Sequence, residues 1–402
     1  MNKKIELLSP AGSLEKLKIA LLYGADACYI GGYKYSLRAN AINFSIDEIK
    51  EACDFAHSLN KLVYVTINIV FHNEELVDII SYLKDLEEAK VDAVILSDPM
   101  LIDVIRDNNI KLAMHISTQA SSLNYETVNF WKNNGVERVV LARELHEDEI
   151  KDIINTTGIE IETFIHGAMC SSYSGRCVLS NYFTNRDANR GGCAQICRWT
   201  FKLCDSNKLE IADESCPLFS LAVKDLSLIN EIEDMINIGI ASLKIEGRMR
   251  SNYYVATVVS TYREAIDNYY NNTLTKDKKK KYEKVLNRVA NRDSKEQFFK
   301  TFPKSDGNYY LGRCEVSNQD YLGLVLDYDE ENNLVILTQR NYFTKNMEVE
   351  FFGPNIETFS FKIDTMYDCD DNIIEIANHP EQIVKIKIDK KLYKNDIMRI
   401  KL

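Results

Sequence analysis

The chain has 402 residues, of which 45% are hydrophobic and 27% are charged, and its formal net charge is −11. This length allows two domains, because single hydrophobic cores stop growing near ~250–300 residues, and the composition excludes a mostly disordered chain. An acidic chain is a poor candidate for a general nucleic-acid coat, so contact with RNA would require a local basic patch. No apolar run approaches the ~18 residues of a membrane span, and the start of the chain lacks a signal-peptide core. We therefore expect a cytoplasmic protein with no membrane partner.

From residue 5 to about residue 247, short β-branched runs alternate with amphipathic helical stretches. The runs are IELL (5–8), ACYIGG (27–32), KLVYVTINIV (61–70), DAVILS (92–97), KLAMHIS (111–117), RVVLA (138–142), IEIETFIHG (159–167), LFSL (218–221) and ASLKIEG (241–247). Such alternation is typical of parallel βαβ units, so residues 1–272 are predicted to form a (β/α)8 TIM-barrel-like domain. A closed barrel needs eight strands, and nine runs are present. We assign the ninth run to an excursion, a long insertion between barrel elements at about residues 168–225. An open doubly wound sheet is the alternative, although no glycine-rich dinucleotide turn follows the first run.

The pattern changes beyond the predicted barrel. Residues 273–307 include the run TKDKKKKYEK, which predicts a charged helical linker. In residues 308–402, short runs alternate with period two and are separated by turn residues. This predicts a small C-terminal domain built as an antiparallel β-barrel or sandwich.

Polar residues recur where the predicted barrel strands end. They are Asn68, Asp98, Ser117, Thr118, Gln119, Arg143, Glu144, His166, Glu246 and Arg248. Each of them alone is more often a helix cap or a loop residue. The carboxyl ends of barrel strands converge on one mouth, however, so their recurrence favours a shared polar site.

Three residues of this set are the candidate catalytic residues, namely His166, Glu246 and Arg143. Asn68 and Gln119 are candidate substrate-binding residues. His166 is about equally well explained as a paired structural histidine. Glu246 is equally explained by a structural ion pair with Arg248.

Six of the ten cysteines fall between residues 170 and 216. Cys170, Cys177, Cys193 and Cys197 are separated by 6, 15 and 3 residues. Paired zinc ligands are usually two to four residues apart, so the first pair fits a zinc ribbon poorly. Four thiolates in a glycine-rich loop can instead wrap an iron–sulfur cluster, which tolerates irregular spacing. The spacing favours an iron–sulfur site, with a zinc site and buried or redox-active thiols as the alternatives.

The cysteine segment also carries a family resemblance. Glu162-x-Phe164-x-x-Gly167-Ala168-Met169-Cys170, followed by Gly175-x-Cys177-x-Leu179-Ser180, resembles the signature of peptidase family U-32, the collagenase-like peptidases. Other segments are similar to the family in the same order, namely LLSPAGS (7–13), YIGG (29–32), HISTQAS (115–121), LARE (141–144) and SLKIEGRMRS (242–251). The β-rich tail is similar to the family's C-terminal domain, so the resemblance extends through most of the chain.

The resemblance implies oxygen-independent hydroxylation more than proteolysis. Members similar to this chain make 5-hydroxyuridine at the tRNA wobble position, with prephenate as the hydroxyl source. Relatives act on ribosomal RNA cytidine or on the ubiquinone ring. A paralogous protein is a further candidate partner. The resemblance further implies a 4Fe–4S cluster on Cys170, Cys177 and Cys193. Cys197 is then the first candidate for the fourth ligand and Cys216 the second, because this chain has Ser227 where some relatives have a cysteine.

The residue chemistry disfavours a peptidase. The six histidines never stand in an HExxH arrangement, and the chain contains no GxSxG nucleophile elbow. A cysteine peptidase could pair one clustered thiol with His115 or His166. That alternative leaves at least three neighbouring cysteines unexplained.

Binding of tRNA and of a small dicarboxylate would require cations. Residues 176–202 contain five basic side chains and one acid, a net charge of +4. Arg176, Arg186, Arg190 and Arg198 stand near aromatic residues there, and together they could bind phosphate and stack on an exposed base. Alternatively, they neutralise the thiolates and pack the excursion. For the two carboxylates of prephenate, the bidentate candidates are Arg38, Arg143 and Arg248.

Overall fold

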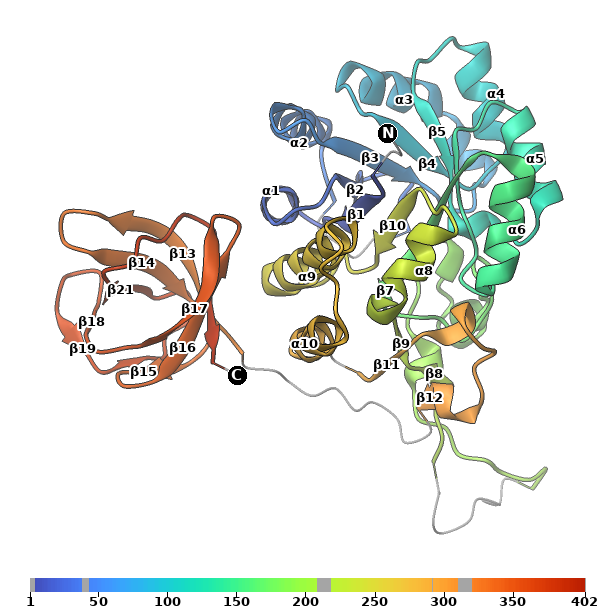
Figure 1. Ribbon diagram of the computed structural model, residues 1–402. Coiled ribbons are helices and arrows are strands. Elements are labelled where there is room, and N and C mark those ends of the chain that lie inside the picture. The colour runs from blue at the N-terminus through green and yellow to red at the C-terminus, as the bar shows by residue number, and fades with distance from the viewer. Residues whose placement is uncertain (1–3, 38–42, 208–217, 291, 310–319, 402) are drawn as a thin grey trace. The chain divides into compact units, whose positions relative to one another are not determined.

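The computed structural model describes residues 4–37, 43–207, 218–290, 292–309 and 320–401. Contacts divide the chain into two compact units, Met1–Glu315 and Val316–Leu402. The first unit holds a parallel barrel surrounded by helices, and the second is an antiparallel β-domain (Figure 1).

Eight parallel strands close the barrel in the order β1-β2-β3-β4-β5-β6-β7-β10, and β10 pairs with both β7 and β1. The strands are β1 (Glu6–Pro10), β2 (Ala27–Gly31), β3 (Leu62–Ile67), β4 (Ala93–Leu96), β5 (Ala113–Ile116), β6 (Arg138–Val140), β7 (Glu160–Gly167) and β10 (Ser242–Ile245). They coincide with eight of the predicted runs. The remaining run, at 218–221, lies in the excursion and joins no barrel strand. The (β/α)8 prediction is therefore confirmed.

Helices connect these strands and cover the outside of the barrel (Figure 1). They are α1 (Leu14–Leu22), α2 (Ile46–Ser58), α3 (Ile79–Glu88), α4 (Met100–Asp107), α5 (Tyr125–Asn133), α6 (Glu147–Thr157), α8 (Ile232–Asn237) and α9 (Asn252–Tyr270). Side-chain caps fix where several of them begin. The Ser13 hydroxyl accepts a hydrogen bond from the backbone N–H of Lys16, and Ser45 with Glu48 forms a capping box on α2. Within the described ranges, no helix is both long and apolar enough to cross a membrane.

The described part of the excursion between β7 and α8 contains the short α-helix α7 (Leu179–Thr184), short 3-10 helices such as Ala188–Arg190 and Ile196–Arg198, and the strands β8 (Ala222–Val223) and β9 (Asp225–Ser227). The segment predicted as a linker packs against it. That segment contains α10 (Lys276–Asn287), and its strands β11 (Ser294–Lys295) and β12 (Asn308–Tyr309) pair with β9 and β8. These pairings place residues 273–307 within the first unit.

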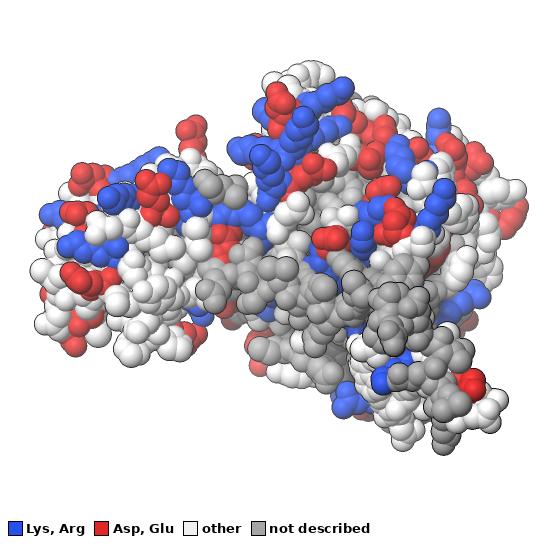
Figure 2. Space-filling view, turned by 90° about the horizontal axis from the view of Figure 1, so that it is seen from below, with Lys and Arg blue, Asp and Glu red and all other residues white. Residues whose placement is uncertain are grey.

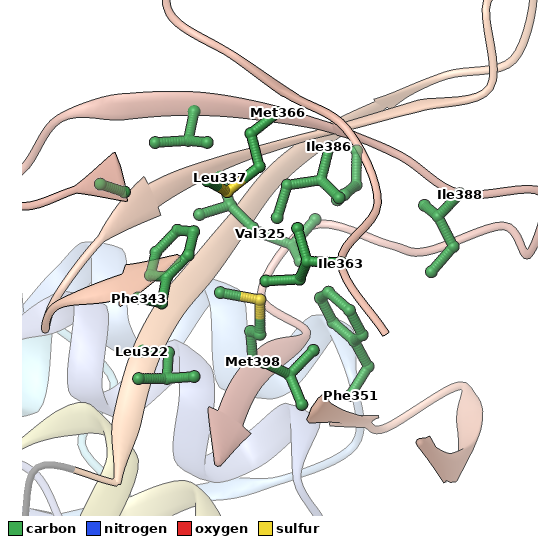
Figure 3. Packing of buried hydrophobic residues seen from close by; sticks show 14 of the residues in the cluster. Leu322, Val325, Leu337, Phe343, Phe351, Ile363, Met366, Ile386, Ile388 and Met398 are labelled. Carbon is green, nitrogen blue, oxygen red and sulfur yellow. The ribbon is translucent and has the colours of Figure 1, made fainter. Parts of the chain in front are cut away.

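The second unit contains an eight-stranded antiparallel sheet in the order β17-β16-β22-β13-β14-β21-β18-β19, and a small β15-β20 sheet. Its strands are β13 (Tyr321–Asp329), β14 (Leu334–Gln339), β15 (Phe343–Thr344), β16 (Glu348–Gly353), β17 (Ile356–Lys362), β18 (Met366–Tyr367), β19 (Ile373–Ile374), β20 (Ile376–Ala377), β21 (Ile383–Lys387) and β22 (Ile397–Ile400). Alternate side chains meet in one core, where Phe343, Phe351 and Met398 are fully buried (Figure 3). The predicted antiparallel β-domain is confirmed. In the described part of this unit the end strands β17 and β19 do not pair with each other, so hydrogen bonds do not close the sheet into a full barrel.

Candidate functional site

A cavity of about 180 Å³ lies at the carboxyl ends of the barrel strands. Eight of the ten residues predicted from strand ends line it, namely Asn68, Ser117, Thr118, Gln119, Arg143, Glu144, Glu246 and Arg248. The other two, Asp98 and His166, are not among its lining residues, and the Asp98 carboxylate accepts a hydrogen bond from the backbone N–H of Met100 at the start of α4 (3.1 Å). The floor is more apolar, because Tyr29, Ile95, Val140 and Phe164 contribute to it. The prediction that the barrel mouth gathers these polar side chains therefore matches the structure.

The excursion supplies the other wall of the cavity through its cysteines. Cys170, Cys177, Cys193 and Cys197 all line the cavity, and none of the four belongs to a disulfide. Burial raises the pKa of Cys197, and the neighbouring Cys193 and Cys177 act in the same direction. Among the described residues, no three or more Cys, His, Asp or Glu side chains are already grouped as a metal centre. The thiols thus share one cavity without converging on one point.

A tight contact seats the start of the excursion on the loop after β5. Gly175 has a φ of +74°, and a β-carbon there would lie 2.1 Å from the backbone oxygen of Gln119. Only glycine fits this position. Glu144 also holds this segment, because its carboxylate accepts hydrogen bonds from the backbone N–H (3.0 Å) and the hydroxyl group of Ser174. These contacts hold the segment between Cys170 and Cys177 over the barrel mouth.

The loop after β3 holds the next part of the excursion. The side-chain amide of Asn189 donates to the carbonyl of Cys177 (2.9 Å), and the Asn189 carbonyl accepts from the backbone N–H of Val70 (2.9 Å). The guanidinium of Arg190 forms ion pairs with Glu74 (2.9 Å) and Glu75. Arg190, which the sequence placed among the RNA contacts, is therefore already bound to carboxylates of the barrel.

Arg143 follows β6 and spans from barrel to excursion. Its guanidinium lies 3.8 Å from the centre of the Phe164 ring, and its Nη1 donates to the carbonyl of Ala168 (2.6 Å). Stacking on an aromatic face holds a guanidinium in a fixed plane. Arg143 therefore presents an oriented cation to the cavity.

Arg248, which follows β10, is buried and also lines the cavity. Its Nη1 donates to the hydroxyls of Ser36 (2.8 Å) and Thr66 (3.2 Å). A β-carbon at Gly31 would lie 2.2 Å from this nitrogen, and one at Gly12 would lie 2.1 Å from the Arg248 backbone oxygen. Two glycines of the segments PAGS and YIGG thus make room for this arginine.

Two charged residues of the barrel interior were missed by the sequence analysis. Lys244 of β10 lines the cavity floor, and its Nζ donates to the fully buried carboxylate of Glu162 on β7 (2.7 Å). Glu162 also accepts from Arg138 (3.3 Å), which pairs with Glu6 (2.5 Å). The signal was present, because Glu162 and Lys244 occupy alternate strand positions that face inward. Both positions lie within the strands, so reasoning from strand ends does not include them.

His166 lies away from the cavity, in contrast to its predicted catalytic place. Lys244 pairs with Phe164 and the next residue, Ile245, pairs with His166, so β7 carries one extra residue here. This β-bulge turns the His166 side chain outward, where it packs against the rings of Tyr254 and Tyr262 on α9. Burial lowers the pKa of His166 to about 3, and its Nδ1 lies 3.3 Å from the Tyr262 hydroxyl. These contacts fit a structural histidine.

The excursion exposes aromatic residues beside arginines. Tyr182 is 85% exposed and Trp199 is 44% exposed, and Arg186 and Arg176 are also exposed. Arg198 is half-buried and donates to the side chain of Gln195 (2.8 Å). Figure 2 shows one face of the molecule, on which basic side chains lie beside acidic ones.

Two further predicted residues, Arg38 and Cys216, lie outside the described residues.

Comparisons with known proteins agree with this architecture. The sequence model "Peptidase family U32" matches residues 12–308, and "Peptidase family U32 C-terminal domain" matches residues 317–399. The chain is 48% identical to tRNA hydroxylation protein P1 of Bacillus subtilis, covering 99% of this chain and 95% of that protein. It is 33% identical to tRNA hydroxylation protein P of Haemophilus influenzae, covering 93% and 91%. It is also 37% identical to the 23S rRNA 5-hydroxycytidine C2501 synthase of Escherichia coli, covering 66% of this chain and 40% of that protein.

The buried position of His166 predicts a pH-dependent loss of stability. The folded pKa of about 3 lies below the ordinary value near 6.5, so below pH 6.5 the unfolded chain binds a proton that the folded chain does not. The His166 contribution to stability is therefore present above this window and is lost as the pH falls. From pH 7 to pH 5, the wild type should lose about 2 kcal/mol more unfolding free energy than His166→Asn, measured by urea denaturation. His379→Asn, at an exposed position, is the control, and equal losses in wild type and His166→Asn would contradict this account.

Proposed function

Since the chain belongs to peptidase family U32, we propose that it is an RNA hydroxylase that converts the wobble uridine of tRNA to 5-hydroxyuridine. The observation that carries this proposal is the similarity, over nearly the whole chain, to a tRNA hydroxylation protein. The cavity supports it independently, because free thiols, oriented arginines and amide side chains line the same space.

In the proposed reaction, the atoms and electrons that uracil gains or loses are matched by those that the co-substrate loses or gains. The C5–H bond of uracil is replaced by C5–OH, which is a two-electron oxidation of the base. With prephenate as the hydroxyl source, the carbon that loses the hydroxyl group takes up the displaced hydrogen and is reduced by the same two electrons. The reaction then needs no molecular oxygen.

Cys170, Cys177, Cys193 and Cys197 are the residues that would hold a 4Fe–4S cluster. Thiolates are the ligands that such clusters take, and these four line one cavity. Ser227, at the position where some relatives have a cysteine, interacts with Tyr262 instead of lining the cavity. This supports Cys197 as the fourth ligand. When bound, the cluster supplies a redox-active iron centre whose potential the surrounding residues adjust.

The arginines of the cavity support a small dicarboxylate co-substrate such as prephenate. A guanidinium can bind a carboxylate through two parallel hydrogen bonds, and Arg143 and Arg248 both line the cavity in positions fixed by other contacts. The rings of Tyr29 and Phe164 also line the cavity, and the Arg143 guanidinium lies over the Phe164 ring, so the lining joins a fixed cation to apolar groups.

The tRNA would reach the cavity from the excursion. A uracil must leave its stack to enter the barrel mouth, as in other enzymes that modify bases. Asn68 and Gln119 line the cavity and carry amides that can pair with the edge of uracil. The exposed Arg186 and Tyr182 of the excursion can contact the phosphate backbone and the neighbouring bases.

The lining of the cavity disfavours the peptidase alternative. A cysteine peptidase needs a histidine within hydrogen-bonding reach of its thiol. None of the described residues that line the cavity is a histidine. His166 is turned outward, and His115 is buried in the barrel interior, where burial lowers its pKa to about 3.

Deletion of the gene tests the proposed function directly. We expect 5-hydroxyuridine and its derivatives to disappear from tRNA nucleosides analysed by mass spectrometry, and to return with a plasmid copy. Any paralogous gene must be deleted in the same strain, because redundancy would hide the effect. Unchanged tRNA together with loss of 5-hydroxycytidine from ribosomal RNA, or of a hydroxylated quinone, would assign the chain to another substrate.

Replacement of the cavity cysteines tests the cluster. Anaerobically purified wild type should contain about four irons per chain. Cys170→Ala, Cys177→Ala, Cys193→Ala and Cys197→Ala should each lose the brown colour, most of the iron and the tRNA hydroxylation. Cys204→Ala is the matched control, since Cys204 is exposed in the same segment and does not line the cavity. Stoichiometric zinc without iron in the anaerobic wild type would reject the iron–sulfur proposal.

The different environments of Arg186 and Arg190 allow a sharp test of RNA binding. Arg186 is exposed, whereas Arg190 is paired with Glu74 and Glu75. Arg186→Ala should weaken tRNA binding and reduce the slope of log affinity against log salt by about one unit, with iron content unchanged. Arg190→Met should leave that slope unchanged, because its charge is already neutralised. If Arg186→Ala has the wild-type slope in filter-binding measurements, the tRNA site lies elsewhere.

A further inference from the structure

Lys244 is a buried amine at the floor of the cavity that no step of the proposed function uses. It is 4% exposed, and its Nζ lies 4.4 Å from the centre of the Tyr29 ring and 5.6 Å from that of Phe164. Burial lowers its pKa, although the nearby Glu162 acts in the opposite direction. The amine therefore sits in an apolar setting with a single carboxylate beside it.

The hydrogen-bonding capacity of this amine is only partly used. An ammonium group has three N–H donors, and in the described residues Lys244 makes one hydrogen bond, to Glu162. Buried polar groups are normally satisfied, and an unsatisfied charged donor costs more than a neutral one. Because Lys244 lines the cavity, a bound molecule can reach the remaining donors.

The neighbourhood suits an anion more than a neutral ligand. Among the described residues, three cations line the cavity, namely Arg143, Lys244 and Arg248, against the two carboxylates of Glu144 and Glu246. Glu144 is already hydrogen-bonded to Ser174 of the excursion. Glu162, the partner of Lys244, lies behind it and does not line the cavity.

We propose that Lys244 is a binding residue for one carboxylate of the small co-substrate, which enters the barrel with that carboxylate towards the floor. Arg143, which contacts the excursion through the Ala168 carbonyl, then faces the second carboxylate, and the aromatic rings of Tyr29 and Phe164 beside Lys244 lie next to the carbon skeleton. The nature of the co-substrate rests on the proposed function, whereas the anion subsite rests on Lys244 itself.

A test must separate ligand binding from a purely structural ion pair. Removing Lys244 alone would leave Glu162 buried next to Arg138 only, which destabilises a fold. The useful variant is Lys244→Met combined with Glu162→Gln, since it removes both charges and leaves Arg138 paired with Glu6 and Glu160. Glu162→Gln alone is the matched control, because it disturbs the same pair but keeps the amine.

Isothermal titration of the purified full-length chain with prephenate, phenylpyruvate and succinate measures the subsite without tRNA. We expect the double variant to bind prephenate about 10- to 100-fold more weakly than wild type, as expected for a lost charged hydrogen bond. Glu162→Gln should bind at least as tightly as wild type, and thermal unfolding should show that both variants are folded.

Equal prephenate affinity in wild type and the folded double variant would overturn the subsite, and so would a wild type that binds none of the three carboxylates. The wild type could instead fail to bind prephenate but bind another of these carboxylates in a Lys244-dependent way. That result would support the anion subsite and contradict the co-substrate of the proposed function. The two failures are thus distinguishable.

Discussion

The pairing of β10 with both β1 and β7 is the constraint on which the rest of the site depends. It closes the barrel, and it brings Lys244, Glu246 and Arg248 of one short segment to the lining of a cavity whose other walls come from distant parts of the chain. Closure also removes the interior charges from water. Arg138, Glu6, Glu162 and Lys244 consequently form a linked set of ion pairs, since isolated charges in that interior would be strongly unfavourable.

Periodicity predicted the architecture well because it reports which faces are buried. Eight β-branched runs became the barrel strands, and the period-two tail became an antiparallel sheet. The strand-end argument succeeded for Asn68, Gln119, Arg143, Glu246 and Arg248 for the same geometric reason. It failed for His166, because the alternation of side chains along β7 changes at a bulge that no local residue pattern marks.

The remaining differences concern partners that are distant in sequence. Arg190 resembled an RNA contact because its neighbours are basic and aromatic, yet its carboxylate partners come from residues more than a hundred positions earlier. The strand positions of Lys244 and Glu162 indicate that both side chains face inward, but their pairing joins two strands that are adjacent only after the barrel closes. Composition and spacing carry no information about such contacts.

The cavity divides into two regions of different chemistry, and this division argues for two substrates. Its thiols come from the excursion, whose exposed arginines lie outside the cavity, whereas the buried Lys244 and Arg248 and the rings of Tyr29 and Phe164 come from the barrel. A large polyanion cannot enter a space of about 180 Å³, so only a single base of an RNA could reach the cavity while the phosphates stay on the excursion. The buried cations of the barrel, with no phosphate backbone to meet, are then suited to a small anion. Thiols between a surface proposed to face RNA and a floor proposed to bind an anion suit the proposed transfer of a group between a nucleobase and a small carboxylate. A peptide substrate would leave the buried cations without a role.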